Sequence, residues 1–147
     1  MASIAKRQDG RWRARYRDSS GREHAKHFRR RVDAQRWLDQ VTASVVRGDY
    51  VDPREGRVTL RTYAASWRKT LVGRPATLSI VDVALDRHIL PRLGDRAVSS
   101  LRRSEVQGLV KGVSETLAPS TTRLVYDILS RVMTAAVHDR VISTRPA

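Results

Sequence analysis

An alternating run of arginines near the N-terminus carries the strongest chemical signal in the sequence. From Arg11 to Arg17 every second residue is an arginine. Successive side chains of a β-strand point to opposite faces. A strand here would therefore gather Trp12, Ala14 and Tyr16 on one face. The other face would carry a row of four guanidinium groups, those of Arg11, Arg13, Arg15 and Arg17.

Four like charges on one small surface repel each other unless a negative partner lies against them. Arginine pairs with phosphates and with guanine edges in the major groove of DNA, which admits a narrow sheet. The run therefore predicts a DNA-binding strand. The alternative is an ordinary solvated strand, for which alternation alone would suffice, and some of these arginines could pair with Asp9, Asp18 or Glu23 instead.

The charge of the whole chain also favours a polyanionic partner. Its 147 residues hold 29 Lys and Arg against 15 Asp and Glu, a formal net charge of +14. The excess is spread along the chain, because residues 1–57 carry 15 basic and 8 acidic residues and residues 58–147 carry 14 and 7. Basic surface on this scale is most often matched to nucleic acid.

Cysteine is absent, which excludes disulfides and thiolate metal sites. No apolar run reaches transmembrane length, and no signal-peptide core follows Met1. We therefore expect a cytoplasmic protein with no membrane partner. His24 and His27 are three residues apart on an expected strand and would face opposite ways, so we predict no metal site.

Turn signals and apolar spacing predict a small α+β unit at the N-terminus. Strands are expected over residues 3–7, 11–17 and 23–28, separated by turns at Gly10 and Gly21. A helix capped by Asp33 should follow and stop at Gly48, with its apolar stripe covering the strands. That stripe consists of Ala34, Trp37, Leu38, Val41 and Val45.

Residues 48–57 lack periodicity and read as a linker, after which four apolar stripes predict a compact four-helix bundle. We expect caps at Thr59 and Ser104, a second helix that ends before Pro91, and a fourth that begins at Pro119 or Ser120. The stripes are Leu60, Tyr63, Ala64, Trp67 and Leu71; Leu78, Val81, Leu85, His88 and Ile89; Val106, Leu109, Val110 and Val113; and Leu124, Ile128, Val132 and Ala135.

Several short motifs, in this order, resemble the N-terminal half of phage integrases of the tyrosine recombinase family, in particular those of actinobacterial phages. Residues 10–16, 26–28 and 34–38 are similar to the arm-type DNA-binding domain of these enzymes. The later motifs resemble the helical core-binding domain, namely residues 77–78, 88–94, 98–101, 118–123 and 135–137.

The resemblance implies an α+β chain in two DNA-binding domains. Residues 1–48 would form a three-stranded antiparallel sheet packed on one helix, residues 49–57 a linker, and residues 58–147 an all-α, SAM-like four-helix domain. Members of this family continue through an Asn-Pro pair into a catalytic domain. In this sequence Arg145 takes the place of that asparagine, before Pro146. We therefore expect that the catalytic domain is absent, and that this chain binds DNA without cleaving it and without a cofactor.

The interface expected in the first domain includes the four arginines of the alternating run and the basic residues around them. Lys26 and Phe28 are two residues apart, so their side chains should point to the same side of the strand. Lys26 would reach the side of the arginines only through a β-bulge or by the length of its side chain. The further candidates are Lys6, Arg7, Arg22, Lys26 and His27.

In the second domain, Thr77 and Ser120 lie near helix starts, where free N–H groups suit a phosphate, although simple helix capping would also explain them. The candidates for DNA contact are Lys69, Arg74, Thr77, Arg87, Ser120, Thr121, Thr122, Arg123 and Arg131.

The partners implied by the resemblance are double-stranded DNA at arm-type and core-type attachment sites, other copies of the protein assembled on DNA, and, as a candidate, a host DNA-bending protein. Two other functions remain open. A stand-alone regulator or architectural protein would dimerise on palindromic sites. An RNA-binding protein would expose aromatic residues on its sheet.

Overall fold

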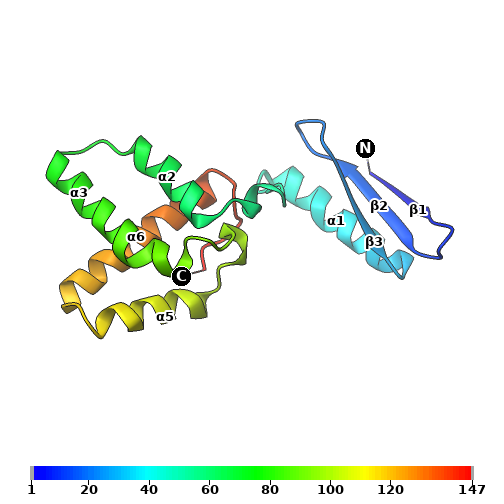
Figure 1. Ribbon diagram of the computed structural model, residues 1–147. Helices are drawn as coiled ribbons and strands as arrows, with labels where there is room; N and C mark the ends of the chain where they lie inside the picture. The colour runs from blue at the N-terminus through cyan, green and yellow to red at the C-terminus, as the bar shows by residue number, and fades with distance from the viewer. Residues whose placement is uncertain (1, 147) are drawn as a thin grey trace. The chain divides into compact units, whose positions relative to one another are not determined.

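The structure, a computed structural model, describes residues 2–146 and divides into two compact units, Met1–Tyr50 and Val51–Ala147 (Figure 1). Ala147, where the second predicted domain ends, lies outside the described residues. The predicted α+β organisation is confirmed, because a three-stranded antiparallel sheet and one helix are followed by a helical unit. None of the described helices is both long and apolar enough to cross a membrane.

The sheet of the first unit is a meander with the strand order β1-β2-β3. Its strands are β1 (Ser3–Lys6), β2 (Trp12–Arg17) and β3 (Glu23–Phe28). The two turns use Gly10 and Gly21 at φ 82° and 83°, a left-handed backbone that glycine adopts without strain. The pairing is regular from Arg17 opposite Glu23 to Trp12 opposite Phe28, so no bulge changes which face a side chain occupies.

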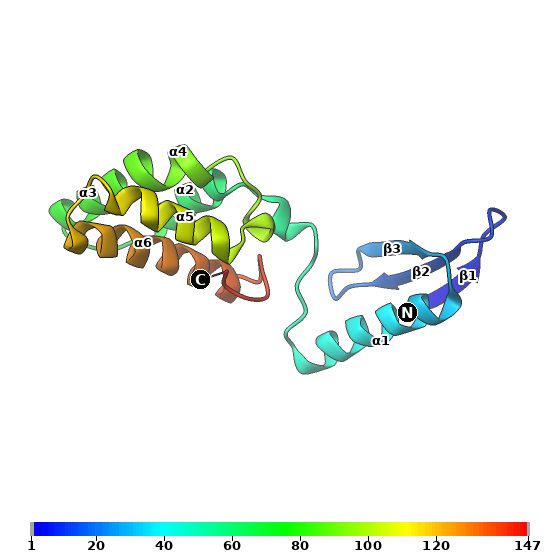
Figure 2. The same cartoon turned by 90° about the horizontal axis from the view of Figure 1, so that it is seen from below.

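Helix α1 (Arg31–Arg47) covers one face of this sheet (Figure 2). A small core forms between them, in which Ala14, Tyr16, Ala34 and Leu38 are buried. Its outer members are Ile4, Trp12, Phe28, Trp37, Val41 and Tyr50. The apolar parity of β2 and the helical stripe therefore meet as the sequence predicts.

The ends of α1 differ in how well the sequence predicted them. Gly48 ends the helix in a left-handed conformation, as expected. Asp33 is not the N-cap, because the helix already begins at Arg31 and Asp33 lies in the first turn, where its charge suits the helix dipole. Val45 is 46 % exposed and lies outside the core, because the sheet ends before the last turns of the helix.

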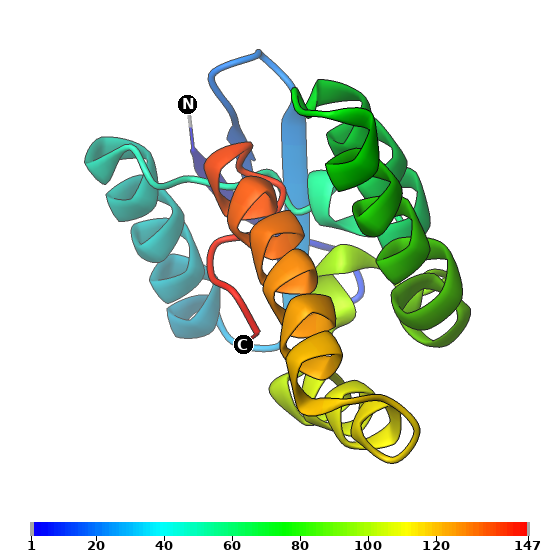
Figure 3. The same ribbon diagram turned by 90° about the vertical axis from the view of Figure 1, so that its left-hand side faces the viewer.

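The second unit contains four helical segments, as predicted. They are α2 (Leu60–Thr70), a continuous run of α3 (Pro75–Val83), η2 (Ala84–Ile89) and α4 (Leu90–Leu93), then α5 (Arg103–Ser114) and α6 (Pro119–His138). Short 3₁₀ turns, η1 (Glu55–Arg57) and η3 (Val98–Ser100), contact each other. Helix α6 lies beside η2, α2 and α5 (Figures 2 and 3).

The second helical segment does not end before Pro91, contrary to the prediction. Residues 84–89 form a π-helical stretch, in which the Leu90 N–H donates to the Leu85 carbonyl five residues earlier. Pro91 then falls in the first turn of α4, where its missing N–H has the least effect. The segment therefore continues to Leu93.

The buried face of α6 is displaced from the predicted stripe. Leu124 is 39 % exposed and Ala135 is only partly buried, whereas Ile128 and Val132 are buried as expected. The remaining core positions are Val125, Leu129, Met133 and Ala136. Because α6 contacts helices on more than one side, it buries a wider face than one stripe.

The caps of the second unit follow the prediction only in part. Thr59 caps α2, its side chain accepting a hydrogen bond from the Thr62 N–H at 3.2 Å. Ser104 does not cap α5, because that helix begins one residue earlier and Arg102 is the N-cap. Gly56 in η1 packs closely on η3, since a Cβ there would lie 2.6 Å from the Ser99 Cβ.

Candidate nucleic-acid interface

The face of the sheet opposite α1 carries the arginines. We call it the arginine face and define it as Ser3, Ala5, Arg13, Arg15, Arg17, Glu23, Ala25 and His27, the residues whose strand parity is opposite to that of the buried Ala14. Among the described residues of the first unit, no helix covers this face (Figure 2). It places three of the four predicted arginines on one surface, and Arg11 lies just before β2 with the same parity.

Small residues flank the arginine row. Arg13 is paired across the sheet with Ala5, and Arg15 with Ser3 on one side and Ala25 on the other. The side chains of Arg13, Arg15 and Arg17 are 42 %, 43 % and 63 % accessible to solvent. The result is a cationic surface that solvent can reach.

One carboxylate lies within this row. The oxygens of Glu23 lie 3.7 Å from Arg13 Nη2, 3.9 Å from Arg15 Nη1 and 3.8 Å from Arg17 Nη2. The alternative of pairing with an acidic residue thus holds for three of the four arginines. Three guanidiniums share a single negative charge, so the surface keeps an excess of positive charge.

The turn between β1 and β2 adds further cations beside this face. Arg7 Nη1 donates to Nε2 of His27 at 3.1 Å and lies 3.9 Å from a carboxylate oxygen of Asp9. The Arg11 N–H donates to the other Asp9 oxygen at 3.0 Å. That backbone hydrogen bond, together with the nearby positive charges, lowers the pKa of Asp9. Arg7, Arg11 and His27 are all exposed.

Lys6 and Lys26, both predicted to contact DNA, do not lie on the arginine face. Lys6 is paired with Trp12 and Lys26 with Ala14, so both have the parity of the side covered by α1. Their ammonium groups lie 5.9 Å from the Trp12 ring and 5.5 Å from the Phe28 ring. The regular pairing excludes the bulge that would have moved Lys26 to the other face, and the ammonium group lies near the Phe28 ring instead.

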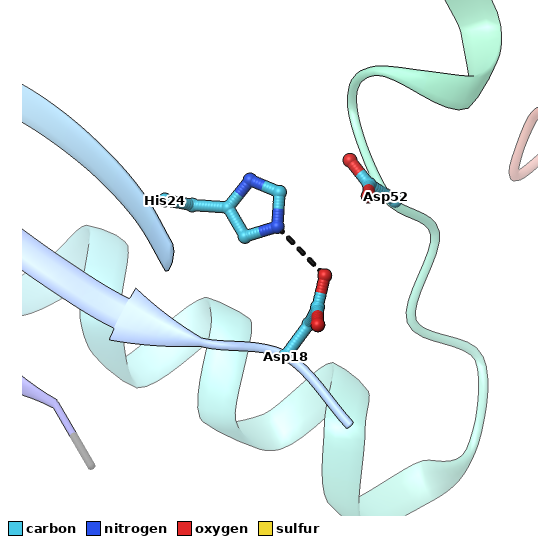
Figure 4. A group of neighbouring side chains, drawn as sticks. All are labelled: Asp18, His24 and Asp52. Carbon is cyan, nitrogen blue, oxygen red and sulfur yellow. Dashed lines mark hydrogen bonds and ion pairs between the residues drawn. The ribbon is translucent and has the colours of Figure 1, made fainter. Parts of the chain in front are cut away.

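The two histidines of β3 have different environments. His27 is exposed on the arginine face, whereas His24 is buried and stacked on Tyr16 with ring centroids 4.9 Å apart. His24 Nε2 donates to Oδ2 of Asp18 at 2.8 Å (Figure 4). Hydrogen bonds from the Ser20 hydroxyl and then from His24 hold the pKa of Asp18 well below its usual range. Sequence reasoning missed this anchor between the β2–β3 turn and β3.

In the second unit, the N-terminal ends of α3 and α6 lie at the same end of the helical bundle (Figures 1 and 2). Neither Thr77 nor Ser120 caps its helix, because the N-caps are Arg74 and Ala118 and neither makes a side-chain cap hydrogen bond. Neither first turn contains an acidic residue. Simple capping therefore does not explain these residues, and both helix starts keep N–H groups that suit an anion.

The candidates on α6 separate onto two sides of that helix. Thr121 lines an apolar hollow of about 180 Å³ with residues of α3 and η2, including Ile80 and His88. Thr122 and Arg123 line a different hollow, next to α5. Arg123 also lies 3.9 Å from Asp127, one turn later. The structure therefore does not bring these three consecutive candidates onto one surface.

The other candidates of the second unit are exposed but dispersed. Lys69 lies at the end of α2, and Arg87 lies in η2. Arg131, in the middle of α6, has its guanidinium 5.6 Å from the Trp67 ring. The candidate interface is consequently better defined in the first unit than in the second.

The tyrosines with hydrogen-bonded hydroxyls are held inside their units. The hydroxyls of Tyr16 and Tyr50 hydrogen-bond each other at 2.8 Å. The buried Tyr63 donates to Oδ2 of Asp139 at 2.6 Å, and burial and that carboxylate raise its pKa. The raised pKa of Tyr63 disfavours the phenolate that a nucleophile requires.

One family model matches most of the first unit. Residues 2–47 match the family model "Phage integrase, N-terminal domain". Two curated integrases are similar over most of the chain: that of Mycobacterium phage D29 is 25% identical over 130 residues, and that of Mycobacterium phage FRAT1 is 25% identical over 124 residues. These matches cover 82% and 78% of this chain but only 34% and 36% of the relatives. The chain thus spans about a third of their length.

Solved structures show the same fold. A lambda integrase tetramer bound to a Holliday junction matches 97% of this chain and 44% of its own, with a TM-score of 0.57 and 21% identity. A lambda integrase dimer bound to a COC' core site matches 97% and 43%, with a TM-score of 0.58 and 20% identity. The resemblance to the N-terminal region of phage integrases is confirmed.

Proposed function

We propose that this chain, whose first unit matches the model of the phage integrase N-terminal domain, recognises double-stranded DNA as the N-terminal part of a site-specific tyrosine recombinase. The arginine face carries the proposal. The guanidiniums of Arg13, Arg15 and Arg17 lie on one face of the sheet, and the large apolar side chains of the sheet lie on the other face, in the core shared with α1. Such a face can enter a major groove and contact phosphates and guanine edges.

The proposed division of labour gives each unit its own DNA site. The first unit would bind arm-type sites through Arg11, Arg13, Arg15 and Arg17, with Arg7, Arg22 and His27 beside them. The second would bind the core site through the N-terminal ends of α3 and α6 and through the exposed Arg87 of η2. Because one chain carries both units, binding at one site raises the effective concentration for the other. Self-association on DNA is part of the same proposal, since both lambda integrase structures are multimers on DNA.

The experiment is selection of duplexes from a random pool by the full chain. We expect two unrelated duplex motifs. R13Q/R15Q should remove one motif and R74Q/R87Q the other, because a lost bidentate arginine–guanine pair costs about 1–3 kcal/mol. The control K111Q/R103Q removes the same charge from exposed positions of α5 outside the proposed interface and should keep both motifs.

Other outcomes would point to other functions. A single palindromic motif that either double variant abolishes would indicate a dimeric regulator instead. Preferential binding of single-stranded RNA would indicate an RNA-binding protein, although Trp12, Tyr16 and Phe28 pack against α1 and are not displayed as a stacking platform.

A further inference from the structure

We propose, on the premise that the arginine face binds DNA, that Glu23 determines specificity by competing with DNA phosphates for Arg13, Arg15 and Arg17. Its carboxylate would weaken binding to DNA of any sequence, and would do so least at a site that offers it a hydrogen-bond donor. Glu23 is thus a negative element built into a positive surface.

The register of the sheet places Glu23 for this role. As the first residue of β3 it lies opposite Arg17 and on the same face as Arg13 and Arg15. The next β3 residue on this face is Ala25, too short to separate the carboxylate from the arginines. Its two oxygens reach all three guanidiniums at 3.7–3.9 Å.

These distances indicate charge attraction without strong hydrogen bonds. Charge-assisted hydrogen bonds of guanidinium to carboxylate measure about 2.7–2.9 Å. Nε of Arg13 is shielded from solvent and has no hydrogen-bond partner among the described residues. Exposed ion pairs of this kind are individually weak. The arginines can therefore exchange Glu23 for a stronger anion such as a phosphate.

Phosphates and base edges act differently on Glu23. Any phosphate close enough to contact these three arginines also lies close to the Glu23 carboxylate and is repelled by it. A cytosine amino group in the major groove can instead donate to that carboxylate. The Glu23 carboxylate therefore lowers the affinity for DNA of every sequence. A hydrogen-bond donor in the groove offsets this loss of affinity, so the difference between specific and non-specific affinity increases.

The test compares the full wild-type chain with E23Q, which keeps the size of the side chain and removes its charge. The matched control is D39N, which removes one negative charge from an exposed position on α1 instead. Affinity is measured across salt concentrations for a random-sequence duplex and for a duplex that the wild-type chain selects. Equal thermal unfolding midpoints verify that the variants are folded.

We expect E23Q to bind the random duplex roughly fivefold more tightly than wild type, with a salt slope steeper by about 1. Its gain at the selected duplex should be smaller, so that the ratio of specific to non-specific affinity falls. D39N should change both duplexes by less than about twofold.

The failures of the two proposals are distinguishable. If the wild-type chain shows no salt-dependent affinity for duplex DNA, the proposed function is wrong. If it binds and R13Q/R15Q weakens binding, the inference on Glu23 is overturned by an E23Q variant whose random-duplex affinity equals that of D39N. An equal gain of E23Q on both duplexes overturns it as well, because Glu23 would then alter affinity without altering specificity.

Discussion

At the scale of single residues, alternate side chains of β2 and β3 point to opposite faces of the sheet, one exposed and one covered by α1. Arg13 and His27 face away from α1, whereas Tyr16 and His24 are buried on the other side. The same alternation removes Lys6 and Lys26 from the arginine face, although net charge alone cannot distinguish them from the arginines. Position on the sheet, and not charge, is what makes a cation a candidate contact.

Asp18 should make the first unit sensitive to acid. Hydrogen bonds from Ser20 and His24 hold its pKa well below the usual range. A carboxylate whose pKa is lower in the folded state stabilises the fold above the unfolded-state pKa of about 4. That stabilisation is lost as the pH falls below 4. We therefore expect D18N to be less stable at pH 7 and to show a flatter loss of stability below pH 4.

Hydrogen exchange of β2 and β3 between pH 7 and pH 2, corrected for the intrinsic rate, would measure this effect. S20A removes the strongest donor and should weaken protection in the same direction. The neighbouring turn residue Ser19 provides the control, and S19A should behave as wild type. An acid profile of D18N that matches wild type would assign the acid sensitivity to other carboxylates.

At the scale of elements, α6 shows how packing on several sides selects the core. Leu129 is 1 % exposed, whereas Leu124 is 39 % exposed and lines the hollow beside α3. L129A should lower the free energy of unfolding by about 2–5 kcal/mol, because it leaves a cavity in the core. L124A should cost less than about 1 kcal/mol.

Urea denaturation of the two variants would measure this difference. Both substitutions remove the same atoms from the same helix, so helix propensity cancels in the comparison. Equal losses would show that Leu124 contributes as much to the stability of the core as Leu129 does, contrary to the exposure of the two side chains.

The elements themselves were largely predictable. Strand alternation, the turns at Gly10 and Gly21 and the C-terminal stop at Gly48 are local signals, and the structure follows them. Helix starts were predicted less well, because Asp33 and Ser104 suit a first turn as well as an N-cap. The helical segment continues through Pro91 because of a π-helical stretch, and no local residue preference predicts that stretch.

At the scale of the whole molecule, positive charge is present in both units and should dominate binding to non-specific DNA. Each phosphate neutralised by a cation contributes about −0.9 to the slope of log affinity against log salt. Since Arg13 and Arg15 lie on the arginine face, R13Q/R15Q should reduce the magnitude of this slope by about 2. The measurement is a salt titration of the full chain on a random duplex.

The control for this prediction removes the same charge from the opposite side of the sheet. K6Q/K26Q should change the slope much less, because both lysines have the parity of the face covered by α1. Equal effects of the two double variants would show that total charge, and not the arginine face, governs binding.

The sequence by itself determined the α+β class, the arginine row, the apolar side of the sheet and the resemblance to phage integrases. These properties depend on periodicity and on motif order, which are local. Only the tertiary structure decided that Glu23 lies among three arginines, that Asp18 anchors His24, and which side of α6 is buried. Such contacts depend on strand register and on helices packing from several directions, and both are settled by segments distant in the chain.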